Sequence, residues 1–218
     1  MLNFSPRGIV ALASHEGLVP GPYQDSVGVW TYGIGHTAAA GKPDPARMPR
    51  GMPANLTAAI QDAVVLFATD IQKYAAEVRA ALQVPVSQHE FDALVSFHYN
   101  TGGIAIAQLT RALNRGDRKA AAEGFMGWLK PISITERRRA EQTLFRDGVY
   151  PTGRLTVWKV NDAGRVLWTP VKTLDANELL SMLAPPSADP LQAWLSAAPA
   201  PVEEIRAWLE AMPANAKL

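Results

Sequence analysis

The 218-residue chain contains no cysteine. Disulfide bonds, thiolate chemistry and cysteine-based metal sites are therefore excluded. A marked excess of one charge is also absent, because 21 lysines and arginines face 20 aspartates and glutamates. Dedicated nucleic-acid-binding proteins usually carry a strong basic excess, so we expect no nucleic-acid partner. A local basic patch would still allow contact with another anionic polymer.

Long hydrophobic runs are absent as well. No segment contains about 18 consecutive apolar residues, the length that a membrane-spanning helix requires. The first residues do not combine a basic start with a long apolar stretch, as a signal peptide would. We therefore expect neither a signal peptide nor membrane insertion, so a target outside the cytoplasm would require a separate release partner.

The composition that is present, 48% hydrophobic and 19% charged, is typical of a globular protein with a sizeable core. Ser5-Pro6 predicts the start of a helix that stops at Gly17. Residues 19–36 interleave β-forming side chains with glycines and predict a small antiparallel sheet. Residues 37–56 contain four prolines and are expected to form a loop.

Helical patterns dominate the next hundred residues. Apolar positions at helical spacing predict a long helix after Thr57, and Ser87 with Glu90 forms a capping box for another. Shorter amphipathic segments follow at about 107–114, 117–128 and 135–146. This order predicts an α+β fold with two lobes, in which the small sheet lies in the smaller lobe.

The pattern changes after Tyr150. Two β-forming segments flank residues 161–164 (Asn-Asp-Ala-Gly) and predict a hairpin, followed by a short helix from Asp175 to Leu183. Residues 185–187 (Pro-Pro-Ser) have the composition of a linker, and two amphipathic segments with Trp194 and Trp208 come after it. We therefore divide the chain into a main domain, 1–150, and a C-terminal extension, 151–218, of unknown role.

Two carboxylates near the N-terminus are candidates for catalysis. Glu16 falls at the end of the first predicted helix, Asp25 falls beside the first strand, and Thr31 lies on the next strand. Glycosidic cleavage requires one carboxylic acid to protonate the leaving oxygen and a second carboxylate on the other side, in a different environment. Spacing alone does not show that Glu16 and Asp25 are catalytic, because two carboxylates separated by eight residues are more often solvated side chains.

The run from Glu16 to His36 resembles the active-site segment of the phage-type lysozymes, glycoside hydrolase family 24. That family has a Glu, eight residues, an Asp, five residues and a Thr, which Glu16, Asp25 and Thr31 match without a gap. The Gly-Ile-Gly-His string at 33–36 matches too, and residues 91–102 and 136–141 resemble later family segments in the same order.

The resemblance implies a lysozyme-like fold over residues 1–150 and hydrolysis of bacterial peptidoglycan. The bond cleaved would be the β-1,4 bond between N-acetylmuramic acid and N-acetylglucosamine, with inversion at the anomeric carbon. Glu16 would be the general acid, and Asp25 with Thr31 would hold the attacking water. No metal and no organic cofactor would be needed.

The resemblance also assigns secondary roles. Arg137 would lie against Glu16 as one of the substrate-binding residues, and His36 would be structural, paired with Asp70. Of the three arginines at 137–139, we expect at least one on a solvated helix face, and we expect Trp128 in the core. Tyr99 and Asn100 are candidates for a sugar-binding wall, because amides hydrogen-bond acetamido groups and aromatic faces pack on sugar rings; a helix-capping role for Asn100 stays equally open.

Two other activities remain open: a non-catalytic peptidoglycan-binding or chitin-binding module, and a lytic transglycosylase. The combination of Glu16, Asp25 and Thr31 disfavours the first, and the water-holding Asp25 disfavours the second. An endolysin would be made in the host cytoplasm without a signal peptide and would act in the periplasm or cell wall, with a holin-like protein as a candidate release partner. Three roles of the extension remain open: binding to the cell wall, forming a surface for a partner, and packing on the core. We expect a chain that ends near Gly153 to keep glycosidase activity.

Overall fold

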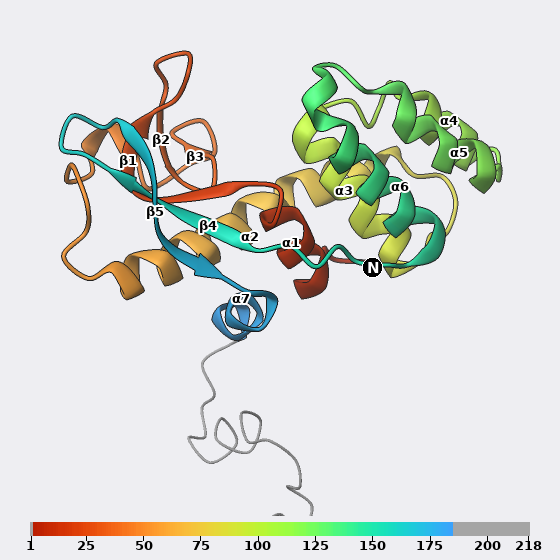
Figure 1. Ribbon diagram of the computed structural model, residues 1–218. Coiled ribbons are helices and arrows are strands. Elements are labelled where there is room, and N and C mark those ends of the chain that lie inside the picture. The colour runs from red at the N-terminus through yellow and green to blue at the C-terminus, as the bar shows by residue number, and fades with distance from the viewer. Residues whose placement is uncertain (1, 185–218) are drawn as a thin grey trace, which may run out of the picture. The chain divides into compact units, whose positions relative to one another are not determined.

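The computed structural model describes residues 2–184. Residues up to Leu183 form one compact unit, drawn in colour in Figure 1. The predicted linker at 185–187 and the segments with Trp194 and Trp208 lie outside the described residues.

The first helix, α1 (Pro6–Ala13), begins where the sequence predicts. The Ser5 side chain accepts a hydrogen bond from the Gly8 N–H and so caps the helix. The predicted end at Gly17 is wrong, because the helix stops at Ala13 and residues 14–16 form a turn. Glu16 therefore lies in this turn, directly before the first strand.

The sheet contains the small antiparallel sheet predicted over residues 19–36 and the predicted hairpin. β1 (Gly17–Gln24), β2 (Trp30–Gly33) and β3 (His36–Thr37) pair in antiparallel fashion. On the other side of β1, β4 (Leu155–Val160) pairs in parallel, and β5 (Val166–Leu174) pairs antiparallel with β4. The strand order is β3-β2-β1-β4-β5, so the hairpin predicted after Tyr150 is present and extends the sheet of the main domain.

The hairpin also contributes to the common core. Leu155, Val157 and Leu174 are fully buried and pack in the same cluster as Leu12 and Leu18. Helix α7 (Ala176–Leu183) follows, as predicted, and Gln61 donates a hydrogen bond to the Met182 carbonyl. Within the described residues, a boundary at residue 150 thus does not separate two compact units, and the stretch 151–183 packs on the core.

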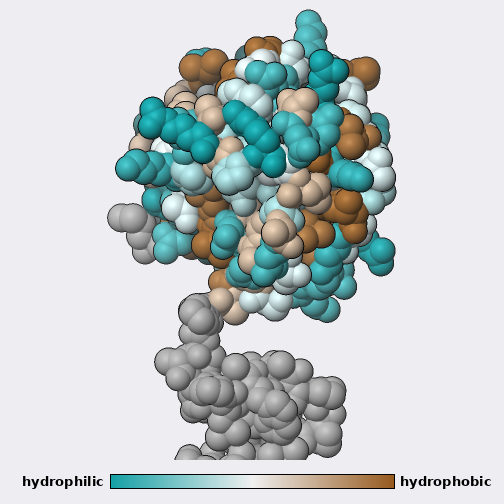
Figure 2. Space-filling view, turned by 90° about the vertical axis from the view of Figure 1, so that its left-hand side faces the viewer, coloured by the Kyte–Doolittle hydropathy of each residue, from teal (hydrophilic) through white to brown (hydrophobic). Residues whose placement is uncertain are grey.

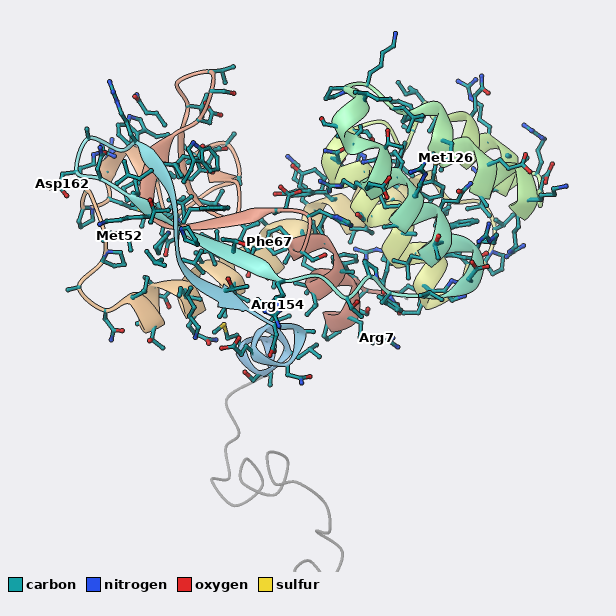
Figure 3. The ribbon with its side chains drawn as sticks, viewed as in Figure 1. Arg7, Met52, Phe67, Met126, Arg154 and Asp162 are labelled. Atoms are coloured by element: carbon teal, nitrogen blue, oxygen red, sulfur yellow. The ribbon has the colours of Figure 1, made fainter. Side chains whose placement is uncertain are left out.

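The turn end of the hairpin packs against the proline-rich loop. Apart from one 3₁₀ turn (Pro45–Arg47), residues 38–55 form neither helix nor strand, as expected. The Val160 N–H lies 3.4 Å from Met52 Sδ, and Gly51, at φ +81°, leaves no space for a Cβ beside Asp162. Figure 3 labels Met52 and Asp162, which lie at the same end of the sheet.

The helical lobe follows a single long helix. α2 starts at Leu56, two residues before the first position of the helix predicted to follow Thr57, with Asn55 as its cap. Its inner face is buried through Ile60, Val64, Phe67, Ile71 and Val78. Ser87 and Glu90 form the predicted capping box of α3. The described helices are α2 (Leu56–Ala81), α3 (Gln88–Thr101), α4 (Gln108–Asn114), α5 (Arg118–Gly124) and α6 (Thr135–Asp147), with 3₁₀ turns at Phe125–Gly127 and Ile132–Ile134.

Figure 1 shows the two lobes of this unit: the sheet at one side, α3 to α6 at the other, and α2 running between them. The α+β fold with its small sheet lobe is therefore confirmed. In the described part of the chain, no helix has both the length and the apolar character to span a bilayer.

Candidate active site

Glu16 is held by an arginine from the other lobe. Arg137 Nη1, on α6, donates a hydrogen bond of 2.7 Å to Glu16 Oε1. The Arg137 side chain is 10% exposed and that of Glu16 is 27% exposed, so the contact is shielded while the carboxylate still reaches the surface. The contact implied by the family resemblance is therefore present.

A buried ionic network stands behind this pair. Glu141 accepts hydrogen bonds on Oε1 from Arg137 Nε and from Ser96 Oγ, and its Oε2 lies 2.7 Å from Arg138 Nη1. Arg138 is fully buried and the Glu141 side chain is 2% exposed. Burial raises the pKa of Glu141, while the positive charges of the two arginines oppose that rise. Arg137 is therefore fixed from behind by a carboxylate that cannot reach solvent.

The third arginine of the run behaves differently. Arg139 is 60% exposed and pairs with Glu136, which is 82% exposed. The prediction that at least one of the three arginines lies on a solvated face is confirmed. Sequence analysis did not identify Arg138 as a buried residue or Glu141 as its partner.

Asp25 closes the turn between β1 and β2. Its Oδ1 accepts hydrogen bonds from the backbone N–H groups of Val27 (2.9 Å) and Val29 (2.8 Å). The Asp25 N–H donates to the Val29 carbonyl, and Gly28 adopts φ +83°, a conformation that favours glycine. Among the described residues nothing donates to Asp25 Oδ2, so one carboxylate oxygen is fixed in place and the other is free to accept.

Thr31 lies on β2 directly across from Tyr23 of β1. Its side chain is buried, and its hydroxyl donates to the Val29 carbonyl at 3.1 Å, which leaves the oxygen lone pairs available. Burial raises the pKa of Tyr23 to about 12, and the negative charges of Asp25 and Glu16 add to this rise. Tyr23 therefore lies near both carboxylates.

The strand β1, which runs between Glu16 and Asp25, is irregular. The pairing register with β2 shifts between Val19 and Tyr23. Such a bulge bends a strand and increases its twist. Sequence analysis assigned Tyr23 only to a strand; its position two residues before Asp25, on the same strand face, was the available signal.

His36 links the sheet to α2. Its Nδ1 lies 2.7 Å from Asp70 Oδ2, and its Nε2 lies 2.8 Å from the Pro43 carbonyl oxygen. The side chain is 2% exposed. Because both ring nitrogens have partners, His36 has the structural position that the resemblance implies and anchors the start of the proline-rich loop.

Tyr99 and Asn100, near the end of α3, have different surroundings. The Tyr99 hydroxyl donates to the Ile34 carbonyl, and its ring packs edge-on against Phe67 and Tyr74. Burial raises the pKa of Tyr99; the charge of Glu16 adds to the rise and that of Arg137 opposes it, so Tyr99 lies near this pair.

Asn100 does not cap its helix, because α3 ends in the left-handed Gly102. Its Oδ1 accepts a hydrogen bond from Arg138 Nη2, and the residue is exposed. It lines a surface hollow of about 420 Å³ together with Trp128, which is half-buried and packs edge-on against Phe97.

Comparison with known proteins agrees with this geometry. The family model described as phage lysozyme matches residues 13–141. The chain is 35% identical over 151 residues to the endolysin of Salmonella phage P22, covering 66% of this chain and 99% of that protein. The chain belongs to the phage lysozyme family.

Solved structures support the same assignment. The endolysin of Escherichia coli O157:H7 phage FAHEc1 is 32% identical, with a TM-score of 0.57, covering 69% of this chain and 97% of that one. The muramidase domain of SpmX from Asticaccaulis excentricus is 26% identical, with a TM-score of 0.54, covering 67% and 99%. As a phage lysozyme, the chain is a glycoside hydrolase that acts on peptidoglycan. The match to the family model ends before β4 and β5.

Proposed function

We propose that this phage lysozyme is an endolysin that hydrolyses the β-1,4 bond between N-acetylmuramic acid and N-acetylglucosamine with inversion at the anomeric carbon. The observation that carries the proposal is the placement of Glu16 and Asp25 at the two ends of a bulged strand, with Tyr23 close to both. Two carboxylates in distinct environments are what acid and base roles require.

Glu16 would act as the general acid. Its protonated carboxyl would give its proton to the glycosidic oxygen as the bond to the anomeric carbon breaks. Arg137 occupies Oε1 of Glu16, which fixes the direction of the carboxyl group and leaves Oε2 for the sugar. Arg137 is then a positioning residue rather than a group that contacts the reacting bond.

Asp25 and Thr31 would hold the attacking water. Two backbone N–H groups fix Asp25 Oδ1, which leaves Oδ2 free. Oδ2 would accept a proton from the water while the water oxygen forms its bond to the anomeric carbon. The Thr31 hydroxyl oxygen, whose proton is directed at the Val29 carbonyl, would accept the water's other hydrogen. Attack from the side opposite Glu16 gives inversion.

Substrate binding would use the end of α3. The exposed amide of Asn100, beside the hollow lined by Trp128, suits the acetamido group of an amino sugar. The Tyr99 hydroxyl is already engaged with Ile34, so its contribution would be to support the Glu16–Arg137 pair with its ring. No metal or organic cofactor is part of this mechanism.

The biological setting of the proposal follows the endolysins that the chain resembles. The enzyme would be made in the host cytoplasm and would reach the wall through a holin-like release partner. No observation favours a non-catalytic binding module or a lytic transglycosylase over hydrolysis.

The test is Glu16→Gln, with Glu136→Gln as the matched control because Glu136 is 82% exposed and pairs with the exposed Arg139. Clearing of purified cell walls is expected to fall by about 10²- to 10⁴-fold in Glu16→Gln and to stay unchanged in the control. Thermal melting checks that both variants fold. Full activity in a folded Glu16→Gln protein would rule out the proposed acid.

A further inference from the structure

The hairpin of β4 and β5 places a tryptophan beside β1, the strand that follows Glu16. Trp158 of β4 packs on Gly17, the residue that follows Glu16, so closely that a Cβ on Gly17 would lie 2.8 Å from the indole Nε1. Leu155 and Val157 of the same strand face the core. Trp158 itself is half-buried, so part of this residue is accessible at the surface.

The local backbone directs this side chain. Pairing between β4 and β5 is irregular on both sides of Trp158, between Val157 and Trp158 and between Trp158 and Val160. Bulges of this kind re-aim side chains and are over-represented next to active sites.

A second tryptophan on β5 completes the arrangement. The Trp168 ring meets the Trp158 ring edge-on, with 5.6 Å between centroids. Trp168 is 71% exposed and adopts φ +51°, a region that a bulky L-residue rarely enters. It is the single described non-glycine residue with positive φ. Strained, exposed positions of this type cluster at ligand-binding sites.

The chemistry around the two rings suits a sugar polymer. The Trp168 ring is 71% exposed, and its indole N–H can donate to hydroxyl or acetamido oxygens. Between Leu155 and Leu174 the hairpin carries three exposed basic side chains, Lys159, Arg165 and Lys172, against one exposed acidic one, Asp162. Lys172 pairs with Glu178, which leaves Lys159 and Arg165 to suit the carboxylates of peptide-substituted glycans.

The surface offers less to a protein partner. Figure 2 views the sheet end of the unit, and on that face the hydrophobic areas are separated by hydrophilic ones rather than joined into one patch. Protein interfaces typically require a contiguous surface of about 800 Å² on each partner. Two indoles inclined at 71° to each other offer a small aromatic surface, which suits a narrow polymer instead.

We propose that Trp158 and Trp168 form an aromatic subsite that stacks against sugar rings of the peptidoglycan glycan strand and extends binding beyond the Glu16 centre. This inference rests on the proposed function for the identity of the ligand. The subsite belongs to the hairpin that follows the residues matched by the family model.

Binding is measured by calorimetry on the full chain carrying Glu16→Gln, so that glycan oligomers from cell walls are not consumed. Trp168 is the residue to change, because its exposed ring can be removed without opening the core. Trp168→Ala is expected to raise the Kd for long oligomers about 10-fold, and Trp168→Phe to recover part of that loss. Val171→Ala, also exposed on β5, is the control and is expected to change nothing.

Kinetics on the otherwise unchanged enzyme provides a second readout. Trp168→Ala is expected to raise KM for long glycan chains with kcat unchanged, and to leave the shortest cleavable oligomer unaffected. If Trp168→Ala leaves both the Kd and the KM for long glycan chains unchanged, the subsite is overturned. It is also overturned if this variant loses self-association of the protein through β5 while its affinity for glycan stays intact. If the wild-type chain binds glycan in a Trp168-dependent way yet does not cleave it, the subsite stands and the proposed mechanism fails.

Discussion

Arg137 Nη1 lies 2.7 Å from Glu16 Oε1, while Nε of the same guanidinium lies 3.2 Å from the buried Glu141. One planar group thus connects the turn before β1 to the buried network of α6. A lysine has the same charge but cannot contact two carboxylates in this geometry.

Arg137→Lys is therefore expected to lower kcat/KM on cell walls by about 10- to 100-fold, because Glu16 loses its fixed orientation. Arg139→Lys is the matched control, since Arg139 is 60% exposed and contacts only Glu136 among the carboxylates described. Equal activity of the two variants would show that Arg137 does not position the acid.

Glu141→Ala is expected to destabilise the fold by about 3–5 kcal/mol, because it leaves Arg138 buried without a compensating charge. Glu136→Ala, on the exposed side of the same helix, is expected to change the free energy of unfolding by less than about 0.5 kcal/mol. Urea unfolding of both variants measures the difference, and a small effect of Glu141→Ala would contradict the buried network.

His15 predicts a pH dependence of stability. Burial, with the nearby charges of Arg137 and Arg138, lowers the pKa of His15 to about 4. The unfolded chain binds this proton near pH 6.5, so it holds more protons than the folded chain between about pH 6.5 and pH 4. Stability therefore falls as the pH drops through that window, by about 1–2 kcal/mol between pH 7 and pH 5 after allowing for partial exposure.

The measurement compares urea unfolding of the wild-type chain and of His15→Gln at pH 7, 6 and 5. The glutamine variant cannot titrate, so its stability should fall less over the same range. Parallel curves for the two proteins would show that His15 contributes nothing to the dependence.

The packing of the hairpin changes the expectation for a shortened chain. Ending the chain at Gly153 removes β4, β5 and α7, and with them the buried side chains Leu155, Val157 and Leu174. Each such side chain stabilises the fold by about 1.5–3 kcal/mol, against a total stability of about 5–15 kcal/mol. We now expect this chain to lose cooperative folding, whereas a chain ending at Ala184 should melt cooperatively; circular dichroism on both decides the point.

Local signals in the sequence were enough to predict most elements. Ser5, the Ser87–Glu90 box and the turn at 161–164 each act within a few residues, and the structure has an element boundary at each. The pairing of β4 with β1 joins residues far apart in the chain, and no local pattern specifies it. For that reason the sequence left open whether the extension packs on the core, and the structure places β4 and β5 in the sheet.

The residues of the site also divide into those that a sequence pattern predicts and those whose positions depend on long-range packing. The ordered motif predicted Glu16, Asp25, Thr31 and the contact of Arg137, because these residues follow a family pattern. Which of three successive arginines is buried depends on how α6 packs against α3, so sequence could not single out Arg138. The Trp158–Trp168 pair depends on bulges in the hairpin, which the sequence pattern does not locate.

The most direct test of hydrolysis by Glu16 and Asp25 is mass analysis of the fragments that the wild-type enzyme releases from purified cell walls in ¹⁸O-labelled water. The mechanism predicts reducing N-acetylmuramic acid ends that carry one solvent oxygen, and no such product from Glu16→Gln. Fragments that end in anhydro-muramic acid without solvent oxygen would contradict it and would show that the enzyme is a lytic transglycosylase.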